Sequence, residues 1–281
     1  MFKSSGRRTL VFTVVALAAV TFGAVAYARN HAWGSYHWAR TKNPFTLKLG
    51  DNLGASWKSF LTTASSDWNA GRTPVQTAVV LGQSNKRCGM VAGTTQVCNG
   101  SYGQNGWLGL ASINVTGGVH ITQGSAKMND TYFAMARYNN KAEKLHVMCQ
   151  EVAHTFGLGH QSETGASLNT CMDYYLNTSD TDTKSTKPNA HDFDMLNQIY
   201  AHLDSTTTLA ATSAASAGQS EVTDDPNSWG ALVSQSANGR GSVYERYNSD
   251  GSKTITHVYW TEEVGARGAS SDHRYDHDDD H

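Results

Sequence analysis

The amino-acid sequence predicts an α+β fold, in which amphipathic helices and short strands build one domain. Three observations lead to this class. Apolar side chains recur at helical spacing in residues 56–69 and again in residues 191–203. The runs 75–81 and 108–115 between them are rich in β-forming residues. Further along, strand-like residues alternate on both sides of Asn248-Ser249-Asp250-Gly251, which is a hairpin signal.

The N-terminal 28 residues have the composition of a secretory signal peptide. Lys3, Arg7 and Arg8 precede an apolar run over residues 10–25, and Ala26-Tyr27-Ala28 offers an A-x-A cleavage site. The sequence therefore predicts a secreted, extracellular protein. An uncleaved membrane anchor remains open as the alternative, because the apolar run is long for a signal peptide. We expect contact with a membrane only in that case.

Charge argues against a nucleic-acid partner. The chain of 281 residues has a formal net charge of −2, and removal of residues 1–28 takes away three positive charges, which gives −5. Nucleic-acid-binding domains instead carry a basic surface. The length suits one domain with appendages, and we expect a monomer.

The four cysteines predict disulfide bonds in an exported protein. Pairing of nearest neighbours would join Cys88 to Cys98 and Cys149 to Cys171. The other two of the three connectivities that four cysteines allow remain open.

The elements are expected in the following order. An extended arm over residues 29–44 leads to a short strand near 45–49, the helix 56–69 and the strand 75–81. Residues 82–106 resemble a loop, and the strands 108–115 and 120–128 follow. A helix and its exit occupy residues 139–160. The remaining segments are an irregular stretch over 161–187, the helix 191–203, a linker over 205–228, an accessory β-hairpin element over 229–262 that docks on the main domain, and a disordered Asp/His-rich tail over 263–281.

The candidate metal-binding and catalytic residues lie together in one stretch, Gln150-Glu151-x-x-His154-x-x-Gly157-x-x-His160. On a helix, residues 150 and 154 lie one turn apart on the same face, with Glu151 beside them. Gly157 can adopt the left-handed conformation that ends a helix, so that the chain returns and brings His160 to the same point. This arrangement suits a catalytic zinc ion with one open position.

The stretch resembles the signature of the metzincin zinc proteases, H-E-x-x-H-x-x-G-x-x-H followed by a methionine-containing turn. Thr170-Cys171-Met172-Asp173-Tyr174 corresponds to that turn, and Gln150 stands where the family has its first histidine. The resemblance extends over residues 45–204. It implies a matrixin-like catalytic domain with a twisted mixed sheet, an active-site helix and a C-terminal helix.

The resemblance also implies roles for single residues. Gln150, His154 and His160 would bind one Zn²⁺, with Gln150 as a neutral and weaker ligand. His146 would lie about 12 Å from His154 along a regular helix, too far to share the ion. Glu151 would be the general base. Two further residues complete the site: Tyr174 as an oxyanion stabiliser or extra ligand, and Met172 as a structural floor below the metal.

The implied function is that of a secreted zinc-dependent metalloendopeptidase. In matrixins an edge strand pairs with the substrate, and residues 120–128 loosely match its pattern, so we expect a protein or peptide to bind there as an extended strand. Asp180 and Asp182 offer a possible Ca²⁺ site, although a solvated loop is the simpler interpretation. The alternative function, which Gln150 favours, is a secreted pseudoprotease with weak or no metal that binds peptides or proteins.

Overall fold

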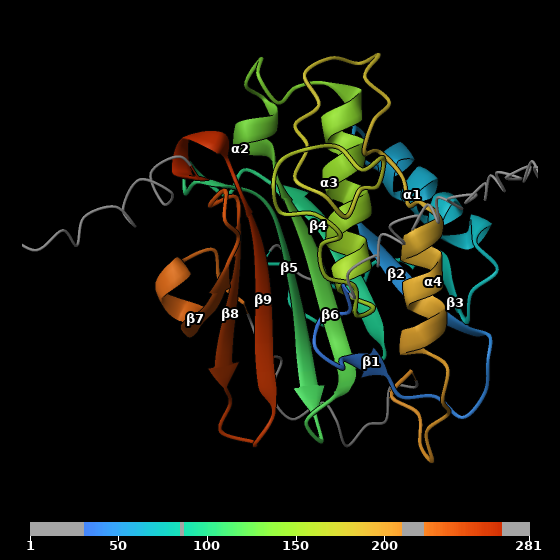
Figure 1. Ribbon diagram of the computed structural model, residues 1–281. Helices are drawn as coiled ribbons and strands as arrows, with labels where there is room; N and C mark the ends of the chain where they lie inside the picture. The colour runs from blue at the N-terminus through green and yellow to red at the C-terminus, as the bar shows by residue number, and fades with distance from the viewer. Residues whose placement is uncertain (1–30, 85–86, 210–221, 266–281) are drawn as a thin grey trace, which may run out of the picture.

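The computed structural model describes residues 31–84, 87–209 and 222–265 (Figure 1). No helix in these ranges is long and apolar enough to cross a membrane. The expected signal segment, and most of the linker and the C-terminal tail, lie outside the described residues. The helices are α1 (Lys58–Ala70), α2 (Asp130–Phe133), α3 (Lys141–His154), α4 (Ala190–Ile199) and the 3₁₀ helix η1 (Pro226–Ser228). The strands are β1 (His37–Trp38), β2 (Phe45–Asn52), β3 (Val75–Leu81), β4 (Thr94–Gly100), β5 (Trp107–Thr116), β6 (His120–Asn129), β7 (Ala231–Gln235), β8 (Gly241–Tyr247) and β9 (Lys253–Trp260).

The strands form one nine-stranded mixed sheet within the described part of the chain, in the order β3-β2-β4-β6-β5-β9-β8-β7, with β1 added to β6. Strands β3, β2, β4 and β6 are parallel, whereas β5, β9, β8 and β7 continue the sheet by antiparallel pairing. Helix α3 packs on the sheet over β5 and β6, and α1 lies beside it (Figure 1). This mixed α/β architecture is compatible with the expected α+β class.

Strand β6 is in the interior of the sheet, so the expectation of a substrate-binding edge at residues 120–128 is wrong. It pairs with β4 on one side and with β5 on the other. Nearly every residue of β6 is buried, as is usual for a strand covered by neighbours. In the described residues the two ends of the strand order, and thus the edges of the sheet, are β3 and β7.

The C-terminal hairpin forms as expected and belongs to the main sheet. Strands β8 and β9 pair around the turn at residues 248–252, where the backbone N–H of Asn248 donates to the carbonyl of Ser252. Strand β9 then pairs with β5 from Trp107 to Val115. A two-stranded hairpin is marginal alone, and this pairing buries β9 on both sides. The hairpin is therefore a continuation of the main sheet rather than a separate accessory unit.

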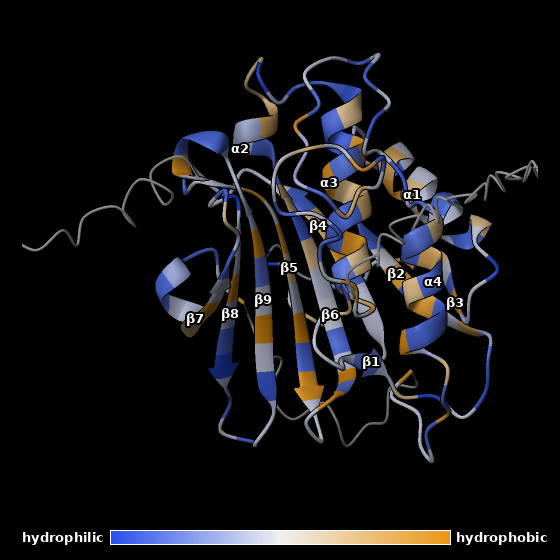
Figure 2. Ribbon diagram, viewed as in Figure 1, coloured by the Kyte–Doolittle hydropathy of each residue, from blue (hydrophilic) through white to orange (hydrophobic). Residues whose placement is uncertain are grey.

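A strand also forms inside residues 82–106, which the sequence analysis treated as a loop. Residues Thr94–Gly100 make β4, between β2 and β6. Its polar side chains are satisfied inside the protein, since Thr95 Oγ1 donates to Thr155 Oγ1 at 3.0 Å and Gln96 Nε2 donates to Thr94 Oγ1 at 2.8 Å. Such internal hydrogen bonds let a polar strand be buried. Figure 2 shows the same mixture of polar and apolar positions along β5 and β9.

The nearest-neighbour disulfides are confirmed. Cys88 is bonded to Cys98, with 6.0 Å between their Cα atoms, and Cys149 to Cys171, with 5.9 Å. The second bridge joins the middle of α3 to the turn at residues 170–174. It therefore links the two segments of the signature covalently.

Candidate metal centre

Residues at both ends of helix α3 explain where it begins and ends. The Asn140 side chain accepts a hydrogen bond from the Glu143 backbone N–H at 2.8 Å and caps the N-terminus. After His154 the chain turns at Gly157, which has a φ of +99°. A Cβ atom at this position would collide with the Tyr36 carbonyl oxygen. The predicted left-handed glycine is confirmed, and it directs the chain toward His160.

Three imidazoles converge below this turn. They belong to His154 at the end of α3, His160 in the segment after it, and His257 in the middle of β9. One ligand nitrogen from each ring lies within 4.8 Å of the others. The ring centroids are 4.0 Å apart for His154 and His257, 4.7 Å for His154 and His160, and 4.4 Å for His160 and His257.

The hydrogen bonds leave lone pairs free in this cluster. His154 Nδ1 lies 2.7 Å from the carbonyl of Leu158, and a carbonyl only accepts, so Nδ1 carries the proton. Its Nε2 atom then has a free lone pair, and among the described residues neither it nor His160 Nε2 nor His257 Nδ1 has a hydrogen-bond partner. An imidazole held by a carbonyl on one nitrogen and free on the other has the form of a metal ligand.

Burial keeps all three rings neutral. It lowers the pKa of His154 to about 4, from an ordinary value of 6.5. Burial, followed by the neighbouring imidazoles, holds the pKa of both His160 and His257 well below that value. Metal ions bind the neutral form of histidine, so the cluster needs no proton loss at neutral pH to bind one.

Gln150 lies one turn before His154 and is fully buried. Its amide Nε2 donates to the carbonyls of Cys171 at 2.9 Å and Asp173 at 2.8 Å, which ties α3 to the methionine-containing turn. Its Oε1 has no hydrogen-bond partner within residues 31–84, 87–209 and 222–265. The assignment of Gln150 as a metal ligand stays a prediction, and these contacts give the residue a second, structural role.

Glu151 is fully buried on the face of α3 that meets β5. Neither carboxyl oxygen has a hydrogen-bond partner in the part of the chain that the structure describes. A Cβ atom added to Gly109 of β5 would lie 2.7 Å from Val147 Cγ1 and closer still to Glu151 Oε1. The absence of a side chain at Gly109 therefore makes room for the carboxyl group. Burial raises the pKa of Glu151 well above its ordinary value of 4.5.

Tyr174 joins the methionine-containing turn to the imidazole cluster. Its ring lies 4.1 Å from the His160 ring, and its hydroxyl is 3.2 Å from His257 Nε2. Burial raises its pKa well above 10, so the phenol is neutral. Met172 is also fully buried, and its carbonyl accepts from the Gln161 backbone N–H at 2.6 Å. This bond fixes the turn beside His160.

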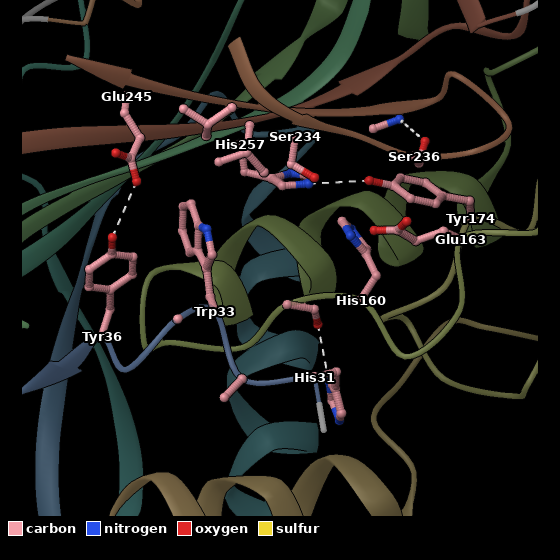
Figure 3. Close-up of a pocket in the computed structure, with 16 residues that line it drawn as sticks. His31, Trp33, Tyr36, His160, Glu163, Tyr174, Ser234, Ser236, Glu245 and His257 are labelled. Atoms are coloured by element: carbon pink, nitrogen blue, oxygen red, sulfur yellow. Dashed lines mark hydrogen bonds between the residues drawn. The ribbon is translucent and has the colours of Figure 1, made fainter. Parts of the chain in front are cut away.

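A pocket of about 350 Å³ reaches the cluster from the surface. His160, His257 and Tyr174 line its inner end (Figure 3). Trp33 forms one wall, with its ring centroid 5.6 Å from that of His154 and 6.0 Å from that of His257. The opposite wall includes Val233 and Ser234 of β7. The pocket thus lies between the N-terminal segment and the outer strand of the sheet.

The sequence analysis missed His257 completely. It lies almost one hundred residues after His160, in a run that reads as an ordinary alternating strand. Only the pairing of β9 with β5, in which His257 is opposite Ala111, brings the ring to α3. No spacing between neighbouring residues in the sequence indicates such a ligand.

The two acidic residues considered for calcium have protein partners. Asp180 accepts from the backbone N–H of Lys141 at 2.6 Å, and Asp182 accepts from the Tyr175 hydroxyl at 2.9 Å. The interpretation as a solvated loop and the Ca²⁺ site both stay predictions.

No protein-family model matches the chain, and comparison with curated proteins finds no match. The metzincin resemblance therefore depends on the residues described above.

Proposed function

We propose that this protein is a zinc-dependent metalloendopeptidase of metzincin type, with the ion held by His154, His160 and His257. The observation that carries the proposal is the convergence of three neutral imidazoles, those of the buried His154 and His257 and the half-buried His160, whose ligand nitrogens lie within 4.8 Å of one another. Three imidazoles with an open fourth position are an established ligand set for catalytic zinc. When bound, zinc polarises a scissile carbonyl and lowers the pKa of its water.

Glu151 is suited to move the proton. A general base works best when its pKa is close to the working pH, and burial shifts this carboxyl group in that direction. Its two oxygens have no other partner, so they are free to accept a proton from water and pass it to the leaving amine. Gly109 preserves the space in which the carboxyl group does this.

Tyr174 supplies a neutral O–H group next to the imidazoles. Because its pKa is raised, the hydroxyl remains a donor at physiological pH. It points toward His257 (Figure 3). A hydroxyl in this place can donate to an oxyanion that develops on the substrate.

The free edge of β7 is the proposed binding surface for an extended substrate. All five residues of β7 are exposed, and among the described residues the strand pairs only with β8. Peptides commonly bind by adding a strand to such an edge. A peptide along β7 would pass Val233 and Ser234 at the pocket, which gives the extended-strand substrate a place that β6 does not offer.

The two disulfides and the signal-like N-terminus support secretion as the setting of this activity. Disulfides form and persist in oxidising compartments such as the cell exterior.

Cleavage of an unstructured protein such as casein by the zinc-loaded enzyme tests the proposal. We expect chelator-sensitive cleavage that the Glu151→Gln variant loses by at least about 100-fold while it retains zinc, the effect typical of removing a general base. A natural protein that binds zinc weakly or not at all and leaves casein intact would instead favour the pseudoprotease.

A further inference from the structure

A second cluster of imidazoles surrounds one carboxylate on the other side of the N-terminal segment. Asp204 Oδ1 lies 3.4 Å from His37 Nε2, 3.3 Å from His120 Nε2 and 3.6 Å from His202 Nε2. The Nε2 atoms of His37 and His202 are 3.1 Å apart. The ligand atoms of His37, His120 and Asp204 all lie within 4.8 Å of one another. None of these residues belongs to the first centre.

Four of these separations are close to the edges of a zinc tetrahedron. Ligand atoms at about 2.0–2.2 Å from zinc, placed at the corners of a tetrahedron, are about 3.3–3.6 Å apart. The three contacts of Asp204 Oδ1 with the imidazoles and the contact between His37 and His202 are 3.1–3.6 Å long. A set of three imidazoles and one carboxylate is closed, with no position left for a substrate, as in structural zinc sites.

The proton positions in the cluster also indicate that a proton or a metal ion lies between His37 and Asp204. His37 Nδ1 lies 2.8 Å from the Ser35 carbonyl, so Nδ1 carries the proton and a neutral His37 presents a lone pair at Nε2. That lone pair faces the carboxylate oxygen of Asp204. Two acceptors at this distance repel each other unless a proton or a metal ion lies between them.

Asp204 is held in place by its other oxygen. The Oδ2 atom accepts from Arg40 Nη1 at 2.9 Å and from the Arg40 backbone N–H at 3.1 Å. Arg40 thus fixes the carboxylate and leaves Oδ1 for the imidazoles. A second atom that orients the ligand in this way is characteristic of metal sites.

We propose that His37, His120, His202 and Asp204 form a second, structural zinc site. It would join β1, the start of β6 and the segment after α4, three parts of the chain that are distant in sequence. His37 directly follows Tyr36, and both Tyr36 and Trp33 line the pocket of the first centre. The second ion would therefore fix the segment that makes one wall of that pocket.

The site is accessible enough to test by substitution. The side chains of His120 and His202 are 32% and 50% exposed, so replacing both with glutamine opens no cavity in the core. His191 is a matched control, because its ring is also partly exposed and belongs to neither cluster.

The experiment counts zinc ions on the full-length protein by native mass spectrometry, after removal of metal and reloading with zinc. We expect the His120→Gln/His202→Gln double variant to bind one zinc fewer per chain than the natural protein, and His191→Gln to bind the same number. The Asp/His-rich tail is present in every variant, so any zinc that it takes up cancels in the comparison. Near-ultraviolet circular dichroism verifies that each variant is folded.

A folded double variant with an unchanged zinc count would overturn the proposal and leave a hydrogen-bonded His/Asp cluster without metal. The result is independent of the first centre, because only the difference between natural protein and variant matters. If the first centre binds no zinc, the count still falls by one, from one ion to none.

Discussion

Replacement of Gln150 with methionine separates its structural contacts from a role in metal binding. Methionine has a similar length but no donors. The change removes two hydrogen bonds, to Cys171 and Asp173. The Asp173 carbonyl keeps a bond from His146 Nε2 at 2.9 Å, whereas no other described residue donates to the Cys171 carbonyl.

The expected loss of stability follows from these contacts. Two hydrogen bonds contribute about 1 kcal/mol each, and an unpaired buried carbonyl costs about 1–3 kcal/mol. The substitution also removes Gln150 Oε1, which is buried without a hydrogen-bond partner among the described residues. The free energy gained by removing this atom offsets the cost of the unpaired Cys171 carbonyl. The free energy of unfolding should therefore fall by about 2 kcal/mol. In a domain of this size that lowers Tm by about 4–8 °C.

Urea unfolding and zinc content, measured on the same preparation, test this expectation. Gln150→Met should be less stable and yet bind as much zinc as the natural protein, since three imidazoles remain. Gln198→Met is a matched control on an exposed helical position and should change stability by less than about 0.5 kcal/mol. A folded Gln150→Met protein that has lost one zinc would refute the reasoning and make Gln150 Oε1 a ligand.

Three further outcomes are expected. Gly109→Ala should displace the Glu151 carboxyl group and reduce casein cleavage by at least about tenfold without loss of zinc; full activity would contradict the assigned position of Glu151. Reducing the Cys149–Cys171 bridge, or replacing both cysteines with serine, should lower the unfolding free energy by about 3 kcal/mol for a loop of this length, and an unchanged urea midpoint would contradict it. The metal-free protein should lose stability in acid, because His154 has a pKa of about 4 when folded and 6.5 when unfolded. The contribution of the neutral His154 ring to the unfolding free energy is complete above pH 6.5, and up to about 3 kcal/mol of it is lost as the pH falls to 4. Equal urea midpoints at pH 7 and pH 5 would exclude this effect.

Local patterns predicted the parts of the structure that depend on local physics. The one-turn spacing of Gln150 and His154 on a helix and the left-handed Gly157 concern neighbours in the chain, and both are present in the structure. The nearest-neighbour disulfides join cysteines that are only 10 and 22 residues apart in the sequence.

The features that were missed depend on pairing between distant strands. Whether β6 is an edge or an interior strand is decided by β4, whose polar residues do not resemble a strand. The position of His257 is decided by the register of β9 on β5, in which it lies opposite Ala111, 146 residues earlier in the chain. Periodicity within either strand contains no information on its partner, so neither outcome was available from the sequence alone.

The most direct test of the first metal centre is the zinc content of His257→Gln beside the natural protein and His191→Gln, all folded by near-ultraviolet circular dichroism. The proposed ligand set requires His257→Gln to bind zinc at one site at least about tenfold more weakly, since one of three ligands is lost, with no change in His191→Gln. If His257→Gln binds the same number of zinc ions with the same affinity, His257 is not a ligand and the three-imidazole centre is wrong.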